Sequence, residues 1–133
     1  MTPRVLVADD DQALRSTVGE MLRGAGYDVA EASDGQVALD ELARQDAEVL
    51  VLDVRMPRKD GISVLNELDP APPPPQVVLV SAYDIDRDVR ARLAPRIFRV
   101  LRKPVVPRTL LDAVSDAARS AHPADRDDED LKP

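Results

Sequence analysis

Short apolar runs recur along the chain at regular intervals. The runs within the first and third predicted strands, Val5–Ala8 and Val49–Leu52, are continuous, a pattern typical of strands that are buried on both faces of a parallel sheet. Each run is too short for a core helix. The full set of predicted strands is Arg4–Ala8, Tyr27–Glu31, Glu48–Leu52, Val77–Val80 and Ile97–Leu101.

Between these runs the apolar residues return at spacings of three and four, which puts them on one face of a helix. Gly24 and Gly26 end the first predicted helix, Ser33 or Asp34 caps the second, and Pro107 begins the last. A helix with a polar exterior is predicted over Asp84–Leu93. The inward-facing residues of the other helices are Leu14, Val18, Met21, Leu22 and Ala25, then Val37, Ala38, Leu39 and Leu42, then Ile62, Val64, Leu65 and Leu68, and finally Leu110, Leu111, Val114, Ala117 and Ala118.

Strands and helices therefore alternate through the chain, five of each. This alternation predicts an α/β fold, a doubly wound five-stranded parallel sheet with five helices in right-handed crossovers. In this architecture ligands bind beyond the carboxyl ends of the strands, near the point where the strand order reverses. We predict one domain over residues 1–120, followed by an acidic and disordered tail over residues 121–133.

Polar residues follow four of the five predicted strands. They are Asp9, Asp10 and Asp11 after the first strand, Asp53 after the third, Ser81 after the fourth and Lys103 after the fifth. Because the carboxyl ends of parallel strands share one edge of the sheet, we expect these side chains to gather there. No glycine-rich loop follows the first strand, which argues against nucleotide binding by that route.

The residue types at this edge favour one kind of chemistry. Crowded carboxylates repel one another unless a cation lies among them, and Mg²⁺ binds carboxylate, carbonyl and water oxygens. Lys103 adds a fixed positive charge and Ser81 a hydroxyl donor, so the set suits a phosphoryl group. A carboxylate in such a site can act as the nucleophile and form an aspartyl-phosphate.

Each residue also has a purely structural explanation. An aspartate after a strand often caps the next helix, and Asp11 fits that role as well as any chemical one. Asp10 and Asp53 are ambiguous when each is taken alone, and a single serine such as Ser81 usually has no chemical role. The combination at four strand ends is difficult to explain by capping, and it favours a functional site.

Composition narrows the class of protein. Apolar residues make up 44% of the chain, with one Phe, two Tyr and no Trp, which is typical of an aliphatic core between a sheet and helices. The chain has no cysteine, which excludes disulfides and thiolate metal sites. The apolar run that follows Met1–Arg4 is too short for a signal peptide or a membrane span, so we predict a soluble, cytoplasmic protein without a membrane partner.

The net charge of −7 is unevenly distributed. Residues 125–132 hold five acids and two bases, whereas residues 87–108 hold eight bases and one acid. The basic segment is either a solvated arginine-rich face or a surface for an acidic protein partner, and a third hypothesis is that the acidic tail folds back over it. Nucleic acid is a less suitable partner, because no helix-turn-helix or aromatic stacking platform accompanies the charges.

One connector has an unusual composition. Asp69–Pro75 contains five prolines, which fix the backbone and remove hydrogen-bond donors. We predict a stiff, extended connector of the polyproline type. Docking of this segment into an SH3-like groove is the alternative.

Four motifs occur in an order typical of one protein family. They are Val5-Leu6-Val7-Ala8-Asp9-Asp10-Asp11 with Arg15, then Asp53-Val54-Arg55-Met56-Pro57 with Asp60-Gly61, then Ser81-Ala82, and then Lys103-Pro104. In residue types, order and spacing this set resembles the receiver domains of two-component response regulators. The resemblance covers roughly residues 3–120 and implies a flavodoxin-like sheet with strand order 2-1-3-4-5.

The resemblance implies a role for each site residue. Asp53 accepts a phosphoryl group from a sensor histidine kinase or a phosphotransfer protein. Asp10 and Asp53 bind Mg²⁺ directly with the backbone carbonyl of Arg55, and Asp9 acts through water. Lys103 pairs with the phosphoryl group, and the Lys103-Pro104 bond is cis. Ser81 swings toward the phosphoryl group.

Several positions depart from the family pattern. Val100 stands three residues before Lys103, where the family usually has a Tyr or Phe that reports phosphorylation to partners. Phe98 is the candidate substitute, because the period of two of a strand predicts that it points the same way as Val100. Lys59 replaces a common glycine, and Ala94–Ile97 lacks a Gly-Ala pair. These changes leave the acceptor site intact and put the output mechanism in question.

Arg55 and Tyr83 lie two residues beyond Asp53 and Ser81. In the family these positions modulate hydrolysis of the phosphoryl group. Both side chains are bulky, so we expect them to shield the phosphoryl group from water.

The sequence thus predicts a stand-alone receiver that is not an enzyme in the usual sense, although it assists its own phosphorylation and slow dephosphorylation. Only 13 residues follow Ser120, too few for an effector domain, so we expect output by phosphorylation-dependent protein interaction or phosphorelay through the fourth helix, fifth strand and fifth helix. One alternative is a degenerate receiver that acts as a phosphorylation-independent interaction module, which only Val100 favours. Another is a phosphohydrolase similar to haloacid dehalogenases, which Arg55 disfavours because those enzymes have a second aspartate at this position.

Overall fold

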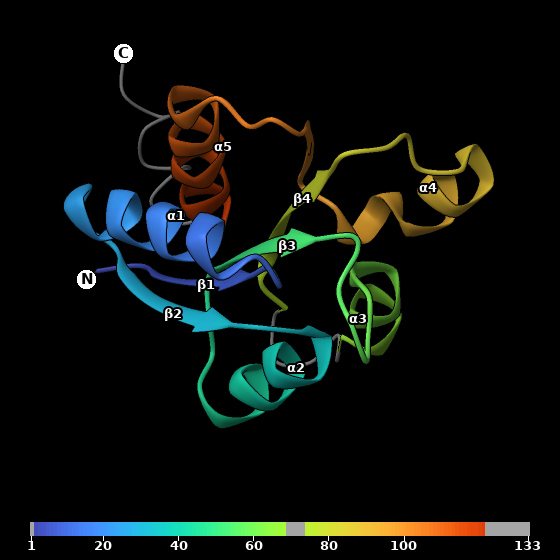
Figure 1. The fold of residues 1–133 in the computed structure, drawn as a ribbon, viewed down its shortest axis with the longest axis horizontal. Coiled ribbons are helices and arrows are strands. Elements are labelled where there is room, and N and C mark those ends of the chain that lie inside the picture. Colours follow the sequence, from blue (N-terminus) through green and yellow to red (C-terminus); the bar gives the residue numbers. More distant parts are fainter. Residues whose placement is uncertain (1, 69–73, 122–133) are drawn as a thin grey trace, which may run out of the picture.

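The computed structural model describes residues 2–68 and 74–121, in which strands and helices alternate (Figure 1). The strands are β1 (Arg4–Ala8), β2 (Asp28–Ala32), β3 (Val49–Asp53), β4 (Gln76–Ser81) and β5 (Arg99–Arg102). The helices are α1 (Gln12–Gly24), α2 (Gly35–Arg44), α3 (Gly61–Glu67), α4 (Arg87–Leu93) and α5 (Pro107–Ser120), with a short 3₁₀ turn, η1 (Ala94–Arg96), between α4 and β5.

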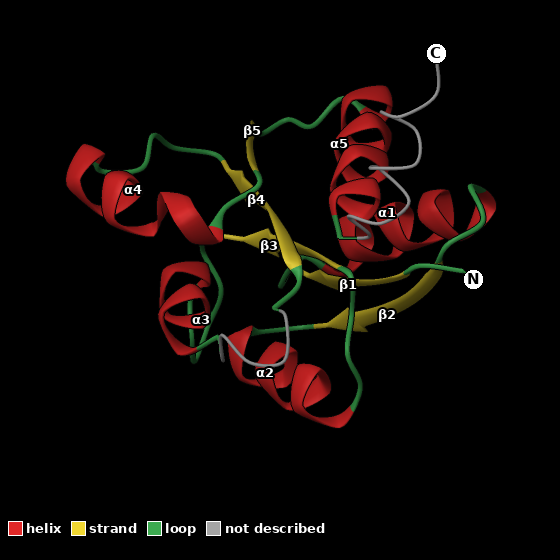
Figure 2. Ribbon diagram, turned by 180° about the vertical axis from the view of Figure 1, so that it is seen from behind, coloured by secondary structure: helices red, strands yellow, loops and turns green. Residues whose placement is uncertain are grey.

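The five strands form one parallel sheet in the order β2-β1-β3-β4-β5. Helices α1 and α5 cover one face of this sheet, and α2, α3 and α4 cover the other (Figures 1 and 2). The predicted α/β class, the doubly wound topology and the strand order 2-1-3-4-5 are therefore confirmed. The order reverses between β1 and β3, so the carboxyl ends of these two strands border the crevice where ligands bind in such sheets.

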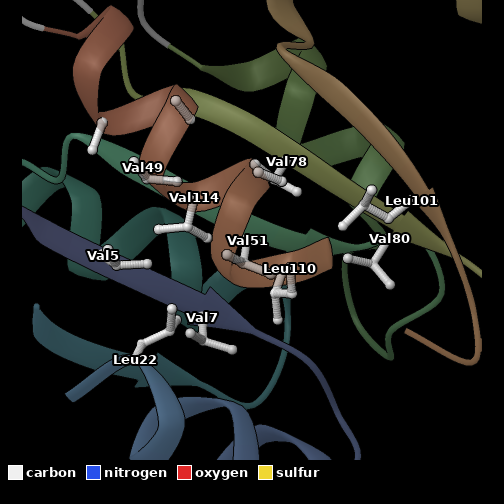
Figure 3. Close-up of a cluster of buried hydrophobic side chains, with 13 residues drawn as sticks. Val5, Val7, Leu22, Val49, Val51, Val78, Val80, Leu101, Leu110 and Val114 are labelled. Carbon is white, nitrogen blue, oxygen red and sulfur yellow. The ribbon is translucent and has the colours of Figure 1, made fainter. Parts of the chain in front are cut away.

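Two hydrophobic clusters hold the helices against the sheet. Alternate residues of each strand point to opposite faces. Val5, Val7, Val49 and Val51 pack with α1 and α5 in the cluster drawn in Figure 3. The leucines between them pack with α2, α3 and α4 on the other face: Leu6, Leu50 and Leu52. Burial on both faces explains why these strands read as continuous apolar runs.

Aspartates begin four of the five helices. The side chain of Asp11 accepts a hydrogen bond from the backbone N–H of Leu14, 3.1 Å away, so Asp11 caps α1. Asp34, rather than Ser33, caps α2. The fourth helix begins later than predicted, at Arg87, because the backbone of Asp86 is not helical and its side chain accepts from the N–H groups of Asp88 and Val89 in the first helical turn.

The prediction that Phe98 and Val100 point the same way is wrong. The last strand begins at Arg99 rather than Ile97, so Phe98 precedes it and the alternation of a strand does not extend to it. Phe98 packs against the cluster of α1 and α5, whereas Val100 packs against the cluster of α2, α3 and α4. Phe98 therefore lies across the sheet from the position that it was expected to fill.

Some expectations fall outside the described residues. Residues 69–73 of the proline-rich connector and residues 122–133 of the acidic tail are among them. The Lys103–Pro104 peptide bond is cis, as the resemblance implied. Among the residues that the structure describes, no helix combines the length and apolar character needed to cross a membrane.

Candidate functional site

The sheet topology brings the predicted site residues to one edge. Asp9 follows β1, Asp53 is the last residue of β3, Ser81 is the last residue of β4 and Lys103 follows β5. The ammonium nitrogen of Lys103 lies 3.2 Å from Oδ2 of Asp53 and 3.4 Å from Oδ2 of Asp9. Residues 94 positions apart in the sequence are thus in direct contact.

Three carboxylates form the centre of this edge. Carboxylate oxygens of Asp9, Asp10 and Asp53 all lie within 4.8 Å of one another. Asp9 and Asp53 are buried, with 7% and 5% of their surface exposed, whereas Asp10 is exposed to solvent. The cluster is therefore open on the side of Asp10 and closed on the sides of the other two.

The three carboxylates differ in the partners that already hold them. Oδ1 of Asp9 accepts from the backbone N–H of Asp11 at 2.9 Å, and its other oxygen faces Lys103. Oδ1 of Asp53 accepts a longer hydrogen bond from the N–H of Arg55, at 3.4 Å. Within the described residues the Asp10 carboxylate makes no hydrogen bond or ion pair. Of the three carboxylates, that of Asp10 is therefore the least engaged by the protein.

The protonation of Asp53 reflects opposing influences. Burial is the largest and raises the pKa of Asp53, and the neighbouring charge of Asp9 raises it further. The ammonium of Lys103 acts in the opposite direction and offsets only part of the rise in that pKa. Burial lowers the pKa of Lys103, but the charges of Asp9 and Asp53 outweigh it, so the lysine pKa is raised and the ammonium stays charged.

The residues present fit a divalent cation. Three carboxylates face one ammonium, so ionised acids would outnumber the positive charge and leave an excess of negative charge within one small cluster. Oxygen ligands of this kind, with an exposed side for water molecules, suit Mg²⁺, which keeps several waters and uses one or two carboxylates. When bound, the ion would neutralise the carboxylates and polarise the oxygens of a phosphoryl group.

The loop after β3 is attached closely to the end of the strand. The N–H of Gly61 donates to the carbonyl of Val54 at 2.7 Å, which closes the loop that contains Arg55. A Cβ at Gly61 would lie 2.5 Å from the carbonyl oxygen of Asp53, closer than atoms can approach without a shift of the backbone. The Asp60-Gly61 motif thus lets α3 begin directly against the residue that carries the central carboxylate.

The side chain of Ser81 is directed at its own loop. Its Oγ donates to the carbonyl of Tyr83 at 2.5 Å and accepts from the N–H of Tyr83 at 3.1 Å. Ser81 is buried beside the site, but no hydrogen bond joins it to Asp53 among the described residues.

The side chains of Arg55 and Tyr83 are in contact with each other. The guanidinium carbon of Arg55 lies 4.5 Å from the centre of the Tyr83 ring, which is within the range of a cation–π contact. Tyr83 is 59% exposed, so the stack stands at the surface. Val100 of β5 is partly buried and packs against the cluster of α2, α3 and α4.

Two groups at this edge were not assigned a role by sequence reasoning. Arg15 of α1 donates to the backbone carbonyl of Asp9 at 2.8 Å and pairs with Glu31 of β2 at 3.3 Å, so it fixes the end of β1. Arg58 of the loop after β3 pairs with Asp34 at the start of α2. Arg15 stands four residues after Asp11, a spacing that could have indicated a helix side chain turned back to the strand end.

One known protein family matches most of the chain, including the residues of the site. The family described as the response regulator receiver domain matches residues 5–115. The chain belongs to this family. Receiver domains are regulatory parts of two-component systems, interact with histidine kinases or phosphotransfer proteins, and generally bind Mg²⁺ at an acidic pocket such as the one formed here by Asp9, Asp10 and Asp53.

Individual relatives support this assignment. The transcriptional regulatory protein PdtaR of Mycobacterium tuberculosis is 40% identical over 90 residues, which are 67% of this chain and 44% of PdtaR. The response regulator MprA of Mycobacterium bovis is 35% identical over 125 residues, 94% of this chain and 54% of MprA. The receiver thus spans about half the length of these two relatives.

Solved structures agree with the fold. The receiver domain of the Francisella response regulator 1452 is 29% identical, with a TM-score of 0.79 over 90% of this chain and 98% of that one. A CheY-like receiver domain protein of Methanospirillum hungatei is 22% identical, with a TM-score of 0.84 over 93% and 99% of the two chains. At this lower identity the second likeness concerns the fold alone.

Proposed function

We propose that this receiver accepts a phosphoryl group on Asp53 from a sensor histidine kinase or a phosphotransfer protein, and that it does so with Mg²⁺ in the cytoplasm. The observation that carries the proposal is the contact of 3.2 Å between Lys103 and Asp53 within the cluster of three carboxylates. A buried carboxylate beside an ammonium and two further acids has little structural purpose, because crowded like charges destabilise a fold.

The proposed transfer requires few groups. An oxygen of Asp53 attacks the phosphorus of a phosphohistidine, the new O–P bond forms as the N–P bond breaks, and the imidazole nitrogen keeps the electron pair and takes a proton from water. Asp10, Asp53 and the carbonyl of Arg55 would hold Mg²⁺, which when bound would neutralise charge on the phosphoryl oxygens. Lys103 holds a second phosphoryl oxygen, and Ser81 donates its hydroxyl to the group after rotating away from Tyr83.

The proposed output is a protein contact, or onward transfer of the phosphoryl group, that uses α4, β5 and α5. Ion pairs neutralise half of the eight bases in this segment: Arg99 pairs with Asp116, Arg102 with Asp84, Arg108 with Asp112, and Lys103 belongs to the site. Among the described residues, the exposed arginines without an acidic partner in this segment are Arg87, Arg90 and Arg92 of α4 and Arg96 of η1, whose guanidinium donates to the backbone carbonyls of Leu65 and Leu68. These arginines favour an acidic partner surface.

The phosphoacceptor role is tested by intact-protein mass spectrometry after incubation with Mg²⁺ and acetyl phosphate. We expect one phosphoryl adduct in the wild-type protein and none in Asp53→Asn. Asp60→Asn is the matched control, because it removes a carboxylate of the same loop while an asparagine still caps α3. An adduct that persists in Asp53→Asn would contradict the proposal.

The output face is tested by pull-down with and without beryllofluoride, a mimic of the phosphoryl group. We expect a partner that binds more strongly with beryllofluoride, and an Arg87→Glu, Arg90→Glu variant that loses this binding. The alternative, a phosphorylation-independent interaction module, has Val100 in its favour, because an aliphatic residue stands where an aromatic reporter is usual. A partner bound equally well in both conditions would support this alternative.

A further inference from the structure

The loop between β3 and α3, residues 54–60, is attached at two ends. At its base the N–H of Val54 donates to the carbonyl of Val80 at 3.0 Å, and Gly61 closes the loop onto the carbonyl of Val54. At its far end the N–H of Lys59 donates to the carbonyl of Pro57 at 2.8 Å, which makes a three-residue turn centred on Arg58. Arg55, whose carbonyl is a proposed ligand of the metal, lies between these two attachments.

The turn at the far end has an uncommon backbone conformation. Arg58 has a φ of 64°, and it is the non-glycine residue with positive φ in the part of the chain that the structure describes. Such a conformation is unfavourable for a residue with a side chain and persists only where its surroundings impose it. The surroundings of Arg58 therefore require an explanation.

The guanidinium of Arg58 is bound to one carboxylate oxygen of Asp34. Its Nε lies 2.8 Å and its Nη2 2.7 Å from Oδ2. The other oxygen of Asp34 accepts from the backbone N–H of Val37 at 2.9 Å and so caps α2. The side chain of Asp34 is only 9% exposed, and its backbone hydrogen bond to Val37 together with Arg58 lowers its pKa, so the carboxylate is charged at neutral pH.

A second contact joins the same two segments. The N–H of Gly35 donates to the carbonyl of Lys59 at 3.1 Å. A Cβ at Gly35 would lie 2.2 Å from that carbonyl oxygen, so the start of α2 and the loop touch with no space for a side chain between them. The far end of the loop is thus attached to α2 by one ion pair and one backbone hydrogen bond.

We propose that the Asp34–Arg58 ion pair is a positioning clasp, which holds the turn of the β3–α3 loop against the first turn of α2 and thereby fixes the backbone of Arg55 beside Asp53. The inference rests on the proposed function, because it assigns to the clasp an effect on Mg²⁺ affinity. Without the clasp the loop keeps its base at Gly61 but loses its attachment at the far end, so the carbonyl of Arg55 is held less firmly. Neither Asp34 nor Arg58 contacts the phosphoryl group in this account.

The test uses variants that separate the clasp from other roles of the same residues. Asp34→Asn keeps the cap of α2, since asparagine caps as well as aspartate, but removes the charge that binds Arg58. Arg58→Gly removes the guanidinium and at the same time relieves the positive φ, whereas Arg58→Ala removes the guanidinium and keeps the strain. Glu67→Gln is the matched control, because it breaks the ion pair of Lys59 with α3, at 2.5 Å, in the same loop but away from α2.

Two measurements are made on the full chain. Mg²⁺ titration followed by NMR gives the dissociation constant, and hydrogen exchange without Mg²⁺ gives the opening of the Gly35 N–H that donates to Lys59. We expect Asp34→Asn and Arg58→Gly to weaken Mg²⁺ binding severalfold and to speed this exchange, and Glu67→Gln to leave both unchanged. Urea unfolding should show Arg58→Gly to be at least as stable as Arg58→Ala, so that lost affinity cannot be attributed to lost stability.

The outcomes distinguish the clasp from the function on which it rests. Wild-type Mg²⁺ affinity and unchanged exchange in Asp34→Asn and Arg58→Gly would overturn the clasp. Failure of the wild-type protein itself to bind Mg²⁺ would overturn the proposed metal site. It would also overturn the predicted effect of the clasp on Mg²⁺ affinity. Equal weakening in Glu67→Gln would also overturn the clasp, because any disturbance of the loop would then suffice.

Discussion

At the scale of single residues, the surroundings of Asp53 disfavour its charged form. Burial and the neighbouring Asp9 raise the pKa of Asp53, and Lys103 offsets only part of this rise. The folded-state pKa of this carboxyl group lies above its ordinary value of 3.8. The folded state therefore loses stability as the pH rises through that folded-state pKa. The site is therefore expected to oppose folding at neutral pH until a cation or a phosphoryl group is present.

The first prediction follows from the raised pKa of Asp53. Without Mg²⁺, Asp53→Asn should have a higher free energy of unfolding than the wild-type protein at neutral pH. The difference should shrink as the pH falls through the folded-state pKa and below 3.8, because the wild-type carboxyl then becomes protonated in both states. Urea unfolding at several pH values measures it, and Asp60→Asn serves as the control from the same loop. A less stable Asp53→Asn at neutral pH would contradict the account.

The second prediction concerns the stack of Arg55 on Tyr83. If this stack shields the phosphoryl group, the Arg55→Ala, Tyr83→Ala double variant should lose the group about 2- to 5-fold faster, because an exposed cation–π contact is worth about 0.5–1 kcal/mol. The decay of the phosphorylated protein, followed by mass spectrometry after removal of acetyl phosphate, gives the rate. Arg87→Ala is the control, and an unchanged lifetime in the double variant would count against shielding.

Sequence reasoning reached the acids and the lysine but not the Asp34–Arg58 pair. Strand ends identify Asp9, Asp10, Asp53 and Lys103, because parallel topology alone brings strand ends together. The ion pair joins residues 24 positions apart from two loops, and no periodicity relates them. The orientation of Phe98 was wrong for a related reason, since the alternation rule was applied to a residue that lies before the regular strand.

At the scale of elements, the site depends on how closely α3 approaches the end of β3. Strand and helix positions were predictable because buried strands and helix faces have strong periodic signals. The ends of these elements were less predictable: capping by Asp86 decides where α4 begins, and the capping residue is one of several aspartates in that segment. Gly61 is a second example. A side chain at this position would collide with the backbone of Asp53, and only the folded loop reveals this close approach.

The third prediction is that Gly61→Ala disturbs the site itself. The added Cβ would meet the carbonyl oxygen of Asp53 at 2.5 Å and Cα of Val54 at 2.9 Å, both of them backbone atoms. We expect a loss of about 1–3 kcal/mol in the free energy of unfolding and weaker Mg²⁺ binding. Gly24→Ala is the control, because nothing lies within 4 Å of its Cβ position, and it should be neutral or slightly stabilising. Wild-type stability and affinity in Gly61→Ala would contradict the close approach.

At the scale of the whole molecule, the sheet gathers acids at one edge, and ion pairs neutralise four of the eight bases of the basic segment over residues 87–108. Sequence composition suggested a broad basic face, but three of its arginines form ion pairs with Asp84, Asp112 and Asp116. The sequence could not reveal this, because partners from different elements meet only after folding. Among the described residues of that segment, the arginines left without an acidic partner are three on α4 and Arg96 of η1.

The fourth prediction is a stabilisation of the whole fold by Mg²⁺. An ion that binds only the folded state at ten times its dissociation constant raises the free energy of unfolding by about 1.4 kcal/mol. Thermal or urea unfolding with and without MgCl₂ measures the gain. Asp10→Asn should abolish it, since the Asp10 carboxylate has no other partner among the described residues. An equal gain in Asp10→Asn would show that the ion binds elsewhere.

The central claim is that Asp53 itself carries the phosphoryl group, and chemical trapping tests it most directly. The protein is incubated with Mg²⁺ and acetyl phosphate and treated with borohydride, which reduces an aspartyl-phosphate to homoserine at the modified position. Peptide sequencing by mass spectrometry then identifies the residue. The account predicts homoserine at position 53, dependent on Mg²⁺ and absent from Lys103→Ala or strongly reduced in it. Homoserine at another aspartate, or none in the wild-type protein, would contradict it.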